Sequence, residues 1–148
     1  MSILSINNVS KWFDNSNGRT EVLKDINLQV AEGEFVAIVG FTGSGKSTLI
    51  NMIAGLTSPS AGEILLKGKP ITGPGHDRSV IFQNYSLLPW LTVYDNIMMA
   101  VNEVYPTWNN QQKDQHVLNM IEMVNLSHAK TKLPKELSGG MRQRTSVA

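Results

Sequence analysis

One stretch of this chain combines residue types and a spacing that could do chemistry. Gly40 is followed, after four residues, by Gly45, Lys46 and Ser47. Glycines in such a loop let backbone N–H groups curl around an oxyanion, and the positive end of a following helix adds to the attraction. Lys46 could contact the terminal phosphate oxygens, and the Ser47 hydroxyl could ligate the Mg²⁺ that bridges them. The pattern predicts a site for a polyphosphate and its Mg²⁺.

Two elements must position this loop. The short apolar run from Phe35 to Val39 has the pattern of a parallel strand buried on both faces, and it would aim the chain at Gly40. After the loop, Leu49, Met52, Ile53 and Leu56 recur at the spacing of one helical face, and Gly55 suits the helix end. The alternative is a glycine-rich turn that matches the spacing by accident.

Length and composition restrict the class of protein. A chain of 148 residues with 41% hydrophobic residues can build a globular core. Its 13 basic and 12 acidic residues give a net charge of +1, which indicates neither a nucleic-acid footprint nor a basic membrane-surface helix. The absence of cysteine excludes disulfides and thiolate metal sites. No export signal or membrane-spanning run stands out, so a cytosolic location is the default and membrane association would need a partner.

The flanking segments predict β-structure. Residues 2–9 and 26–30 alternate and should pair as antiparallel strands, and residues 63–66 with Ile71 should form a short hairpin. Trp12 and Phe13 could pack in the core or stack on a base, and core packing is favoured. Residues 79–82 predict a core strand that ends at Gln83. A polar residue at such an end is a candidate ligand contact, although a solvated glutamine is the commoner case.

The second half of the chain predicts helices. Thr92 and Asp95 resemble a capping box that opens a helix to about Val101, and a longer helix should run from about Gln111 to Asn125. Ser138 can cap another helix whose N–H groups Gly139 and Gly140 leave unobstructed, which makes a second anion-ready helix end; a plain cap is the favoured alternative. The methionines and tryptophans of this part are interpreted as packing residues: Trp90, Met98, Met99, Trp108, Met120 and Met123. The histidines His76, His116 and His128 predict no metal site.

Taken in order, the segments GFTGSGKST, Gln83 and LSGG after a helical insert resemble an ABC-type ATPase subunit over the whole chain. The runs DRSVIFQNYSLLPW and LSGGMRQR are similar to the ATP-binding subunits of nitrate, taurine, sulfonate and bicarbonate importers, with nitrate the nearest. The resemblance implies an α/β fold: a P-loop NTPase core, an antiparallel β subdomain and an inserted helical subdomain. It divides the chain into residues 1–86, the helical residues 87–137, and residues 138–148.

The resemblance also implies a role for particular residues. Phe13 would stack on adenine, with Trp12 as runner-up. Gln83 would approach Mg²⁺ and the attacking water, so that Lys46 and Gln83 are the catalytic candidates and Ser47 and Gln83 the metal candidates. The residues implied to bind ATP in the loop are Gly40, Phe41, Thr42, Gly43, Ser44, Gly45, Lys46, Ser47 and Thr48. Ser138, Gly139 and Gly140 would bind the γ-phosphate held by a second subunit in a head-to-tail dimer.

The implied activity is ATP hydrolysis that energises import of a small anion at the cytoplasmic face of the inner membrane. The implied partners are integral membrane permease subunits, which residues 84–90 would face, a second ATPase subunit that is identical or homologous, and indirectly a solute-binding protein, with no nucleic acid. Two alternatives remain: a non-transport ABC clamp acting on nucleic acid or ribosomes, and a nucleotide-binding piece without hydrolysis.

Two departures from the family pattern are visible. Met141 stands where the family commonly has Gln and would not supply that residue's amide contact. The sequence ends at Ala148, before the family's Walker B strand, its Mg²⁺-binding Asp, the catalytic Glu and the switch His. We therefore expect the front portion of a longer subunit. Alone, this portion should be marginally stable, with an open sheet edge at residues 35–39, and should hydrolyse ATP negligibly.

Overall fold

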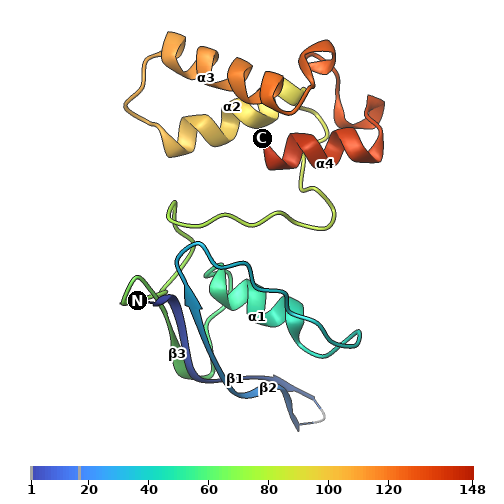
Figure 1. The fold of residues 1–148 in the computed structure, drawn as a ribbon. Helices are drawn as coiled ribbons and strands as arrows, with labels where there is room; N and C mark the ends of the chain where they lie inside the picture. Colours follow the sequence, from blue (N-terminus) through green and yellow to red (C-terminus); the bar gives the residue numbers. More distant parts are fainter. Residues whose placement is uncertain (1, 17) are drawn as a thin grey trace. The chain divides into compact units, whose positions relative to one another are not determined.

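The computed structural model describes residues 2–16 and 18–148. The chain divides into two compact units, Met1–Ser79 and Val80–Ala148, each with its own hydrophobic core (Figure 1). The first unit contains the β-sheet and one helix, and the second is helical. Each unit is described by itself.

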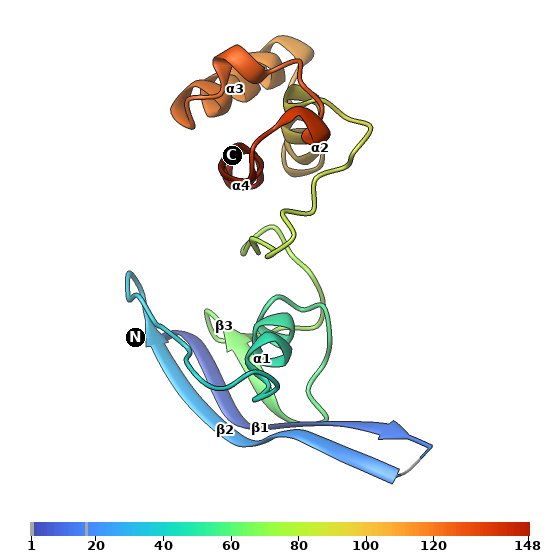
Figure 2. The same ribbon diagram turned by 90° about the vertical axis from the view of Figure 1, so that its right-hand side faces the viewer.

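The sheet of the first unit is antiparallel. Its strands are β1 (Ser2–Asn15), β2 (Gly18–Ala31), β3 (Ala61–Leu66) and β4 (Lys69–Pro70), in the order β2-β1-β3-β4. The predicted pairing of the first two strands is confirmed by a register that runs from Ser2 opposite Ala31 to Asn15 opposite Gly18. Both strands are longer than predicted, and their paired ribbon curves and extends past the end of β3 (Figure 2). Several register shifts along the β1 and β2 ladder accompany this curvature.

Helix α1 (Lys46–Ile53) packs on this sheet. The core comprises Ile6, Val9, Leu23, Leu49, Met52 and Ile64. Gly55 follows the helix with φ of +79°, and a Cβ on it would lie 2.1 Å from the carbonyl oxygen of Gly73. The predicted use of Gly55 at the helix end is therefore confirmed, because any side chain there would collide with backbone. The prediction for Leu56 is wrong: it lies beyond the helix and is 50% exposed.

Two predicted core strands do not form. Residues 35–39 form no strand, and the side chains of Phe35 and Val39 are 94% and 87% exposed. Residues 79–82 likewise form no strand, and Ile81 and Phe82 are 57% and 41% exposed. A strand forms only where a neighbouring strand accepts and donates its backbone hydrogen bonds, and none of the described residues pairs with either segment. The prediction of two core strands is therefore wrong in both the pairing and the burial of these segments.

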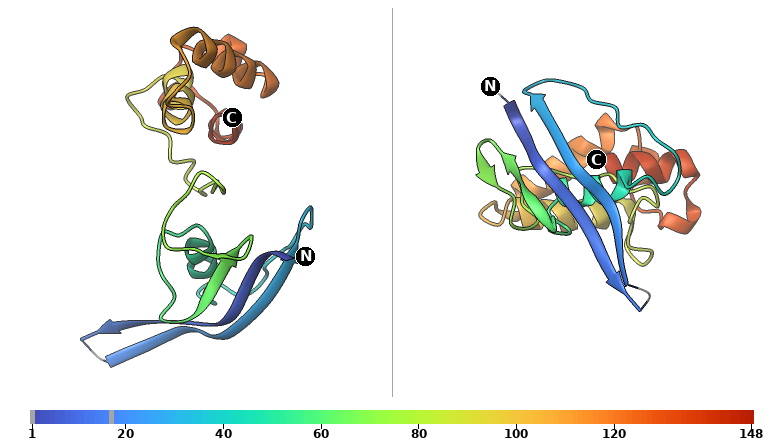
Figure 3. Two further views of the ribbon diagram at one scale, coloured as in Figure 1. Left: turned by 90° about the vertical axis from the view of Figure 1, so that its left-hand side faces the viewer. Right: turned by 90° about the horizontal axis from the view of Figure 1, so that it is seen from below.

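The second unit is built from α2 (Val93–Val104), α3 (Asn110–Met123) and α4 (Gly139–Val147), with short 3-10 turns at Ser127–Ala129 and Pro134–Glu136 (Figure 3). The capping box at Thr92 and Asp95 is confirmed, although α2 runs three residues past its predicted end. A second capping box joins Asn109 to Gln112 at the start of α3. The core of this unit is formed by Val93, Ile97, Val101, Val117, Ile121, Leu126, Ala129 and Leu137.

The packing role predicted for the methionines and tryptophans holds only in part. Met98 and Met120 pack against this core, and Trp108 stacks on Tyr105 with ring centroids 3.9 Å apart. Trp90 and Met123 instead are 70% and 71% exposed, and Met99 is half exposed. Among the described residues, no helix is both long enough and apolar enough to span a bilayer.

Candidate functional site

The loop before α1 adopts the conformation that its glycines permit. Gly43 and Gly45 have φ of +83° and +89°, and Gly45 is the N-cap residue of α1. A Cβ on Gly45 would lie 2.7 Å from the Leu23 Cδ2 atom and 3.0 Å from the Val22 carbonyl oxygen. Strand β2 therefore packs closely against the loop at Gly45. Both the positive φ and the lack of room for a Cβ require glycine at this position.

The ammonium group of Lys46 lies inside the loop. Its Nζ atom donates to the carbonyl oxygens of Gly40 at 2.8 Å and Phe41 at 2.7 Å, and approaches the Ser44 hydroxyl at 3.4 Å. The Ser44 N–H closes the turn by donating to the Phe41 carbonyl at 3.1 Å. The positive charge is thus held where the backbone converges, close to the helix N-terminus.

This arrangement fits an anion of the polyphosphate class. A cavity of about 160 Å³ is lined by Val22, Gly43, Gly45, Lys46, Ser47 and Thr48. In the described part of the chain no side chain caps the first turn of α1, so the helix end offers N–H groups and positive potential to a ligand. The Ser47 hydroxyl lines the same cavity and is an oxygen donor of the kind that Mg²⁺ accepts. Of the predicted loop residues, five line this cavity: Gly43, Gly45, Lys46, Ser47 and Thr48. The roles of Gly40, Phe41, Thr42 and Ser44 in binding stay predictions.

Trp12 and Phe13 do not pack in the core, which was the favoured prediction for both. They lie within strand β1 rather than beside a loop, opposite Glu21 and Thr20 of β2. Phe13 is 47% exposed, and the Arg19 guanidinium covers the Trp12 ring at 3.4 Å from its centroid. Neither ring belongs to the core, so the favoured packing role is wrong. The Lys11 ammonium lies over the Phe13 ring at 5.0 Å from its centroid, a looser contact than that of Arg19 with Trp12, and the stacking role of Phe13 stays a prediction.

Gln83 belongs to the second unit and is exposed. It lies in a turn in which the Tyr85 N–H donates to the Phe82 carbonyl at 3.0 Å, and Tyr85 and Ser86 both adopt positive φ. Gln83 and Lys46 lie in separate units of the chain. The role of Gln83 stays a prediction.

The predicted helix cap at Ser138 is confirmed. The Ser138 hydroxyl accepts a hydrogen bond from the Met141 N–H at 3.3 Å, and Gly139 and Gly140 form the first residues of α4. A Cβ on Gly139 would lie 3.7 Å from the Tyr85 hydroxyl, and the Arg142 guanidinium lies 5.9 Å from the centroid of the Tyr85 ring. The segment that follows Gln83 therefore lies against the start of α4.

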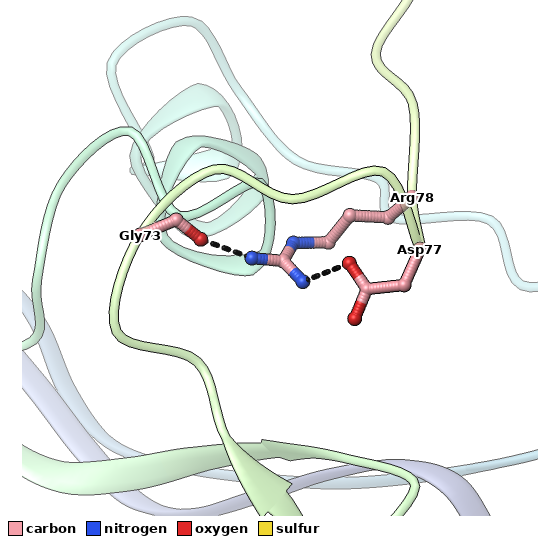
Figure 4. A network of polar contacts seen from close by, with 3 residues as sticks. All are labelled: Gly73, Asp77 and Arg78. Carbon is pink, nitrogen blue, oxygen red and sulfur yellow. Dashed lines mark hydrogen bonds and ion pairs between the residues drawn. The ribbon is translucent and has the colours of Figure 1, made fainter. Parts of the chain in front are cut away.

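Two polar residues escaped the sequence reasoning. Asn96, buried in the first turn of α2, bonds to the backbone of residues 88–92. Arg78 pairs with Asp77 at 2.5 Å and donates to the Gly73 carbonyl, which pins the loop that abuts Gly55 (Figure 4). The only sequence signal for Asn96 is a polar residue on the apolar face that Val93, Ile97 and Val101 define.

Comparison with known proteins assigns the family. The ABC transporter family model matches residues 23–148. The bicarbonate transport ATP-binding protein CmpD of Synechococcus elongatus is 46% identical over 145 residues, which are 98% of this chain and 52% of that protein. The nitrate import ATP-binding protein NrtC of Synechocystis is 46% identical over 149 residues, which cover 100% of this chain and 22% of that protein.

Solved structures agree with the sequence relatives. The ATP-binding cassette MJ0796, in a dimeric post-hydrolysis state bound to ADP and Pi, superposes with a TM-score of 0.86 at 29% identity, over 97% of this chain and 67% of that one. A second dimeric structure of MJ0796 superposes with a TM-score of 0.85. The present chain spans about half the length of CmpD and 22% of the length of NrtC. The glycine-rich loop, Lys46 and the α4 cap follow one another in the order found in this family. Because the family model matches residues 23–148, the chain belongs to the ABC transporter family and has the fold of its ATP-binding cassette.

Proposed function

We propose that this chain is the nucleotide-binding portion of an ATP-hydrolysing subunit that energises an ABC importer for a small inorganic anion. The observation that carries the proposal is the loop from Gly40 to Thr48, in which Lys46 and the uncapped first turn of α1 face one cavity. The bicarbonate and nitrate relatives support the solute class. Because both kinds match at 46% identity, the expectation that favours nitrate gains no support over bicarbonate.

In this proposal the loop binds the triphosphate tail of ATP. The Lys46 ammonium exchanges its contacts with the Gly40 and Phe41 carbonyls for phosphate oxygens, and the N–H groups of the first turn of α1 bind the same oxygens. The Ser47 hydroxyl, and Gln83 from the second unit, would hold Mg²⁺. When bound, Mg²⁺ neutralises charge on the phosphate oxygens of ATP.

The remaining groups extend the site beyond the phosphates. Phe13, half exposed on β1, would stack on adenine, and such stacking is worth about 1–3 kcal/mol per base in nucleic-acid complexes. Ser138, Gly139 and Gly140 would bind the γ-phosphate held by a second subunit, because they begin a helix whose N-terminus favours anions. The dimeric form of MJ0796 supports such an arrangement without deciding between an identical and a homologous partner.

The membrane partner would be the importer's permease. Residues 84–90 would face it, and the subunit would associate with the cytoplasmic face of the membrane only through that partner, with a solute-binding protein acting on the outer side. ATP-dependent closure of the dimer would then move the permease.

Calorimetry on the full-length protein tests the proposal. Titration with Mg·ATP should give a saturable heat, and Lys46→Ala should weaken the affinity about 100-fold or more, because a charge-assisted contact to phosphate is lost. Lys24→Ala, which removes an exposed lysine from β2, should bind as the wild type does. Absence of binding by the correctly folded wild type would refute the proposal. Co-purification of nucleic acid instead of a permease would favour the clamp alternative.

A further inference from the structure

Asn96 is fully committed to hydrogen bonds that no sequence motif predicts. Its side-chain Oδ1 accepts from the Leu88 N–H at 2.8 Å. Its Nδ2 donates to the carbonyl oxygens of Leu88 at 3.3 Å, Leu91 at 3.0 Å and Thr92 at 2.9 Å. An asparagine amide has two N–H donors, so one of them is shared between carbonyls. Asn96 is 8% exposed, and an amide buried this deeply would be costly if these partners were missing.

The backbone that Asn96 holds forms a tight turn. The Leu91 N–H donates to the Leu88 carbonyl at 3.1 Å, and Pro89 occupies the second position of the turn, where its fixed φ is suitable. Asn96 bonds to both ends of this turn, and the capping box between Thr92 and Asp95 fixes the residue that follows. The turn is therefore anchored to α2 at Leu88, Leu91 and Thr92.

Trp90 stands at the third position of this turn and is 70% exposed. A tryptophan presented on a rigid turn has the character of an interface anchor, because it offers a large contact area at little further cost in conformational entropy. Held only by its neighbours in sequence, the same side chain would have to be ordered on binding. The four bonds of Asn96 order the backbone of the turn in advance, so that only the side-chain torsions of Trp90 are left to be fixed on binding.

We propose that Asn96 is a positioning residue that pre-organises the Leu88–Thr92 turn, so that Trp90 contacts the permease. This inference rests on the proposed function, because the partner is the permease of the importer. Asn96 itself contacts neither the nucleotide nor the permease. It acts through the backbone of the turn, which is an acceptor at three carbonyls and a donor at one N–H.

The test uses the full-length subunit assembled with its permease in proteoliposomes, with nitrate and bicarbonate uptake as separate assays. Asn96→Asp has nearly the same shape but no N–H donors, so it should release the turn; we expect uptake of the transported anion to fall about tenfold. ATP hydrolysis by the subunit without permease should change less than twofold. Asn102→Asp, the same substitution at an exposed position of α2, is the matched control and should leave both activities unchanged.

A double-mutant cycle with Trp90→Ala distinguishes positioning from a general loss of stability. Once Trp90 is removed, Asn96→Asp should reduce uptake by no more than twofold further, whereas additive losses would overturn the proposal. Acrylamide quenching of Trp90, in a background with Trp12→Phe and Trp108→Phe, should show a more mobile indole in Asn96→Asp. If Asn96→Asp fails to fold, Asn96→Ser provides the second variant. Absence of coupling between the substitutions at Asn96 and Trp90, or quenching of Trp90 equal to that in the wild type, would equally overturn the proposal. Loss of uptake in Lys46→Ala with normal uptake in Trp90→Ala would reject this inference and leave the proposed function standing.

Discussion

The chain begins two helices at a glycine-rich, anion-ready end, and the two ends are built differently. At α1 the N-cap residue is Gly45 in a left-handed conformation, with no side-chain cap among the described residues and a lysine folded inward. At α4 the N-cap residue is Ser138 in an extended conformation, and its own hydroxyl accepts the Met141 N–H. One helix end is left open to a ligand, and the other is already satisfied by the chain.

This difference indicates how each end would meet a phosphate. The α1 end has its charge and donors in place, and a ligand has only to displace the contacts of Lys46 with the loop carbonyls. The α4 end must exchange a long, exposed cap of 3.3 Å for a phosphate oxygen, which is a small change in free energy in either direction. Tight binding should therefore depend on α1, whereas α4 should contribute a conditional contact.

The largest effect should come from the lysine at the open end. In the full-length subunit, Lys46→Ala should lower ATP hydrolysis by about 100-fold or more, because no other cation lines the cavity in the described residues. Phosphate release measured with and without permease would show it, with Lys24→Ala as the control. Turnover within threefold of the wild type would contradict the assignment of α1 as the tight site.

The second largest effect is a difference in the free energy of unfolding between two glycine substitutions before α1, which separates backbone strain from steric overlap. Gly45→Ala combines a positive φ with a contact of 2.7 Å to Leu23, so it should destabilise the full-length protein by about 2–4 kcal/mol. Gly43→Ala has nearly the same φ but no atom within 4 Å of the added methyl, and it should cost about 1 kcal/mol. Urea unfolding measures both free energies. Equal losses would show that β2 does not restrict the loop.

A smaller effect is expected at the capped end. Ser138→Ala should destabilise α4 by about 0.5–1 kcal/mol, at the low end for an N-cap because the bond is long and exposed. Its effect on Mg·ATP affinity of the monomer should be less than twofold, while nucleotide-dependent dimerisation should weaken. Ser146→Ala in the same helix serves as the control, and dimerisation can be followed by analytical ultracentrifugation. Loss of monomer affinity comparable with that of Lys46→Ala would remove the distinction between the two ends.

The smallest effect lies in the second unit, away from either helix end. The hydrogen bond that Tyr94 donates to Asp114 at 2.6 Å, with help from burial and the charges of Asp114 and Asp95, raises the pKa of Tyr94 to about 12. A raised pKa means that this bond stabilises the fold below pH 10 and that its contribution is lost as the pH rises from 10 to about 12. Because the pair is exposed, Tyr94→Phe should cost less than about 1 kcal/mol at neutral pH. Ultraviolet titration of wild type against Tyr94→Phe should reveal one tyrosine that ionises late; its absence would exclude the bond in solution.

The features predicted correctly from sequence are those that depend on residues within about one helical turn of each other along the chain. The capping box at Thr92 and Asp95, the cap at Ser138 and the glycine after α1 each depend on a few neighbouring residues, and each was predicted in place. The conformation of the glycine-rich loop before α1 belongs to the same class, because Gly43 and Gly45 set it locally, whereas phosphate binding there stays a proposal.

The features predicted wrongly depend on partners that are distant in sequence. Residues 35–39 have the composition of a buried strand, yet they pair with none of the described residues, so composition described their chemistry without deciding their burial. The core packing predicted for Phe13 is wrong for a different reason. Phe13 does lie in a paired strand, but at a place where the β1 and β2 ribbon extends past the core. Asn96 belongs to no sequence motif, and its role depends on the turn at residues 88–92 to which it bonds.

By itself the sequence determined where the glycine-rich loop, the helix caps and the helical segments lie, because each is governed by backbone preferences and hydrogen bonds between near neighbours. Only the tertiary structure decided which apolar segments are buried, that β2 presses on Gly45, and that Asn96 anchors the turn carrying Trp90. Those outcomes depend on contacts between residues far apart in the chain or across a turn, and such contacts form only when a specific partner surface is present to exclude water or complete a hydrogen bond.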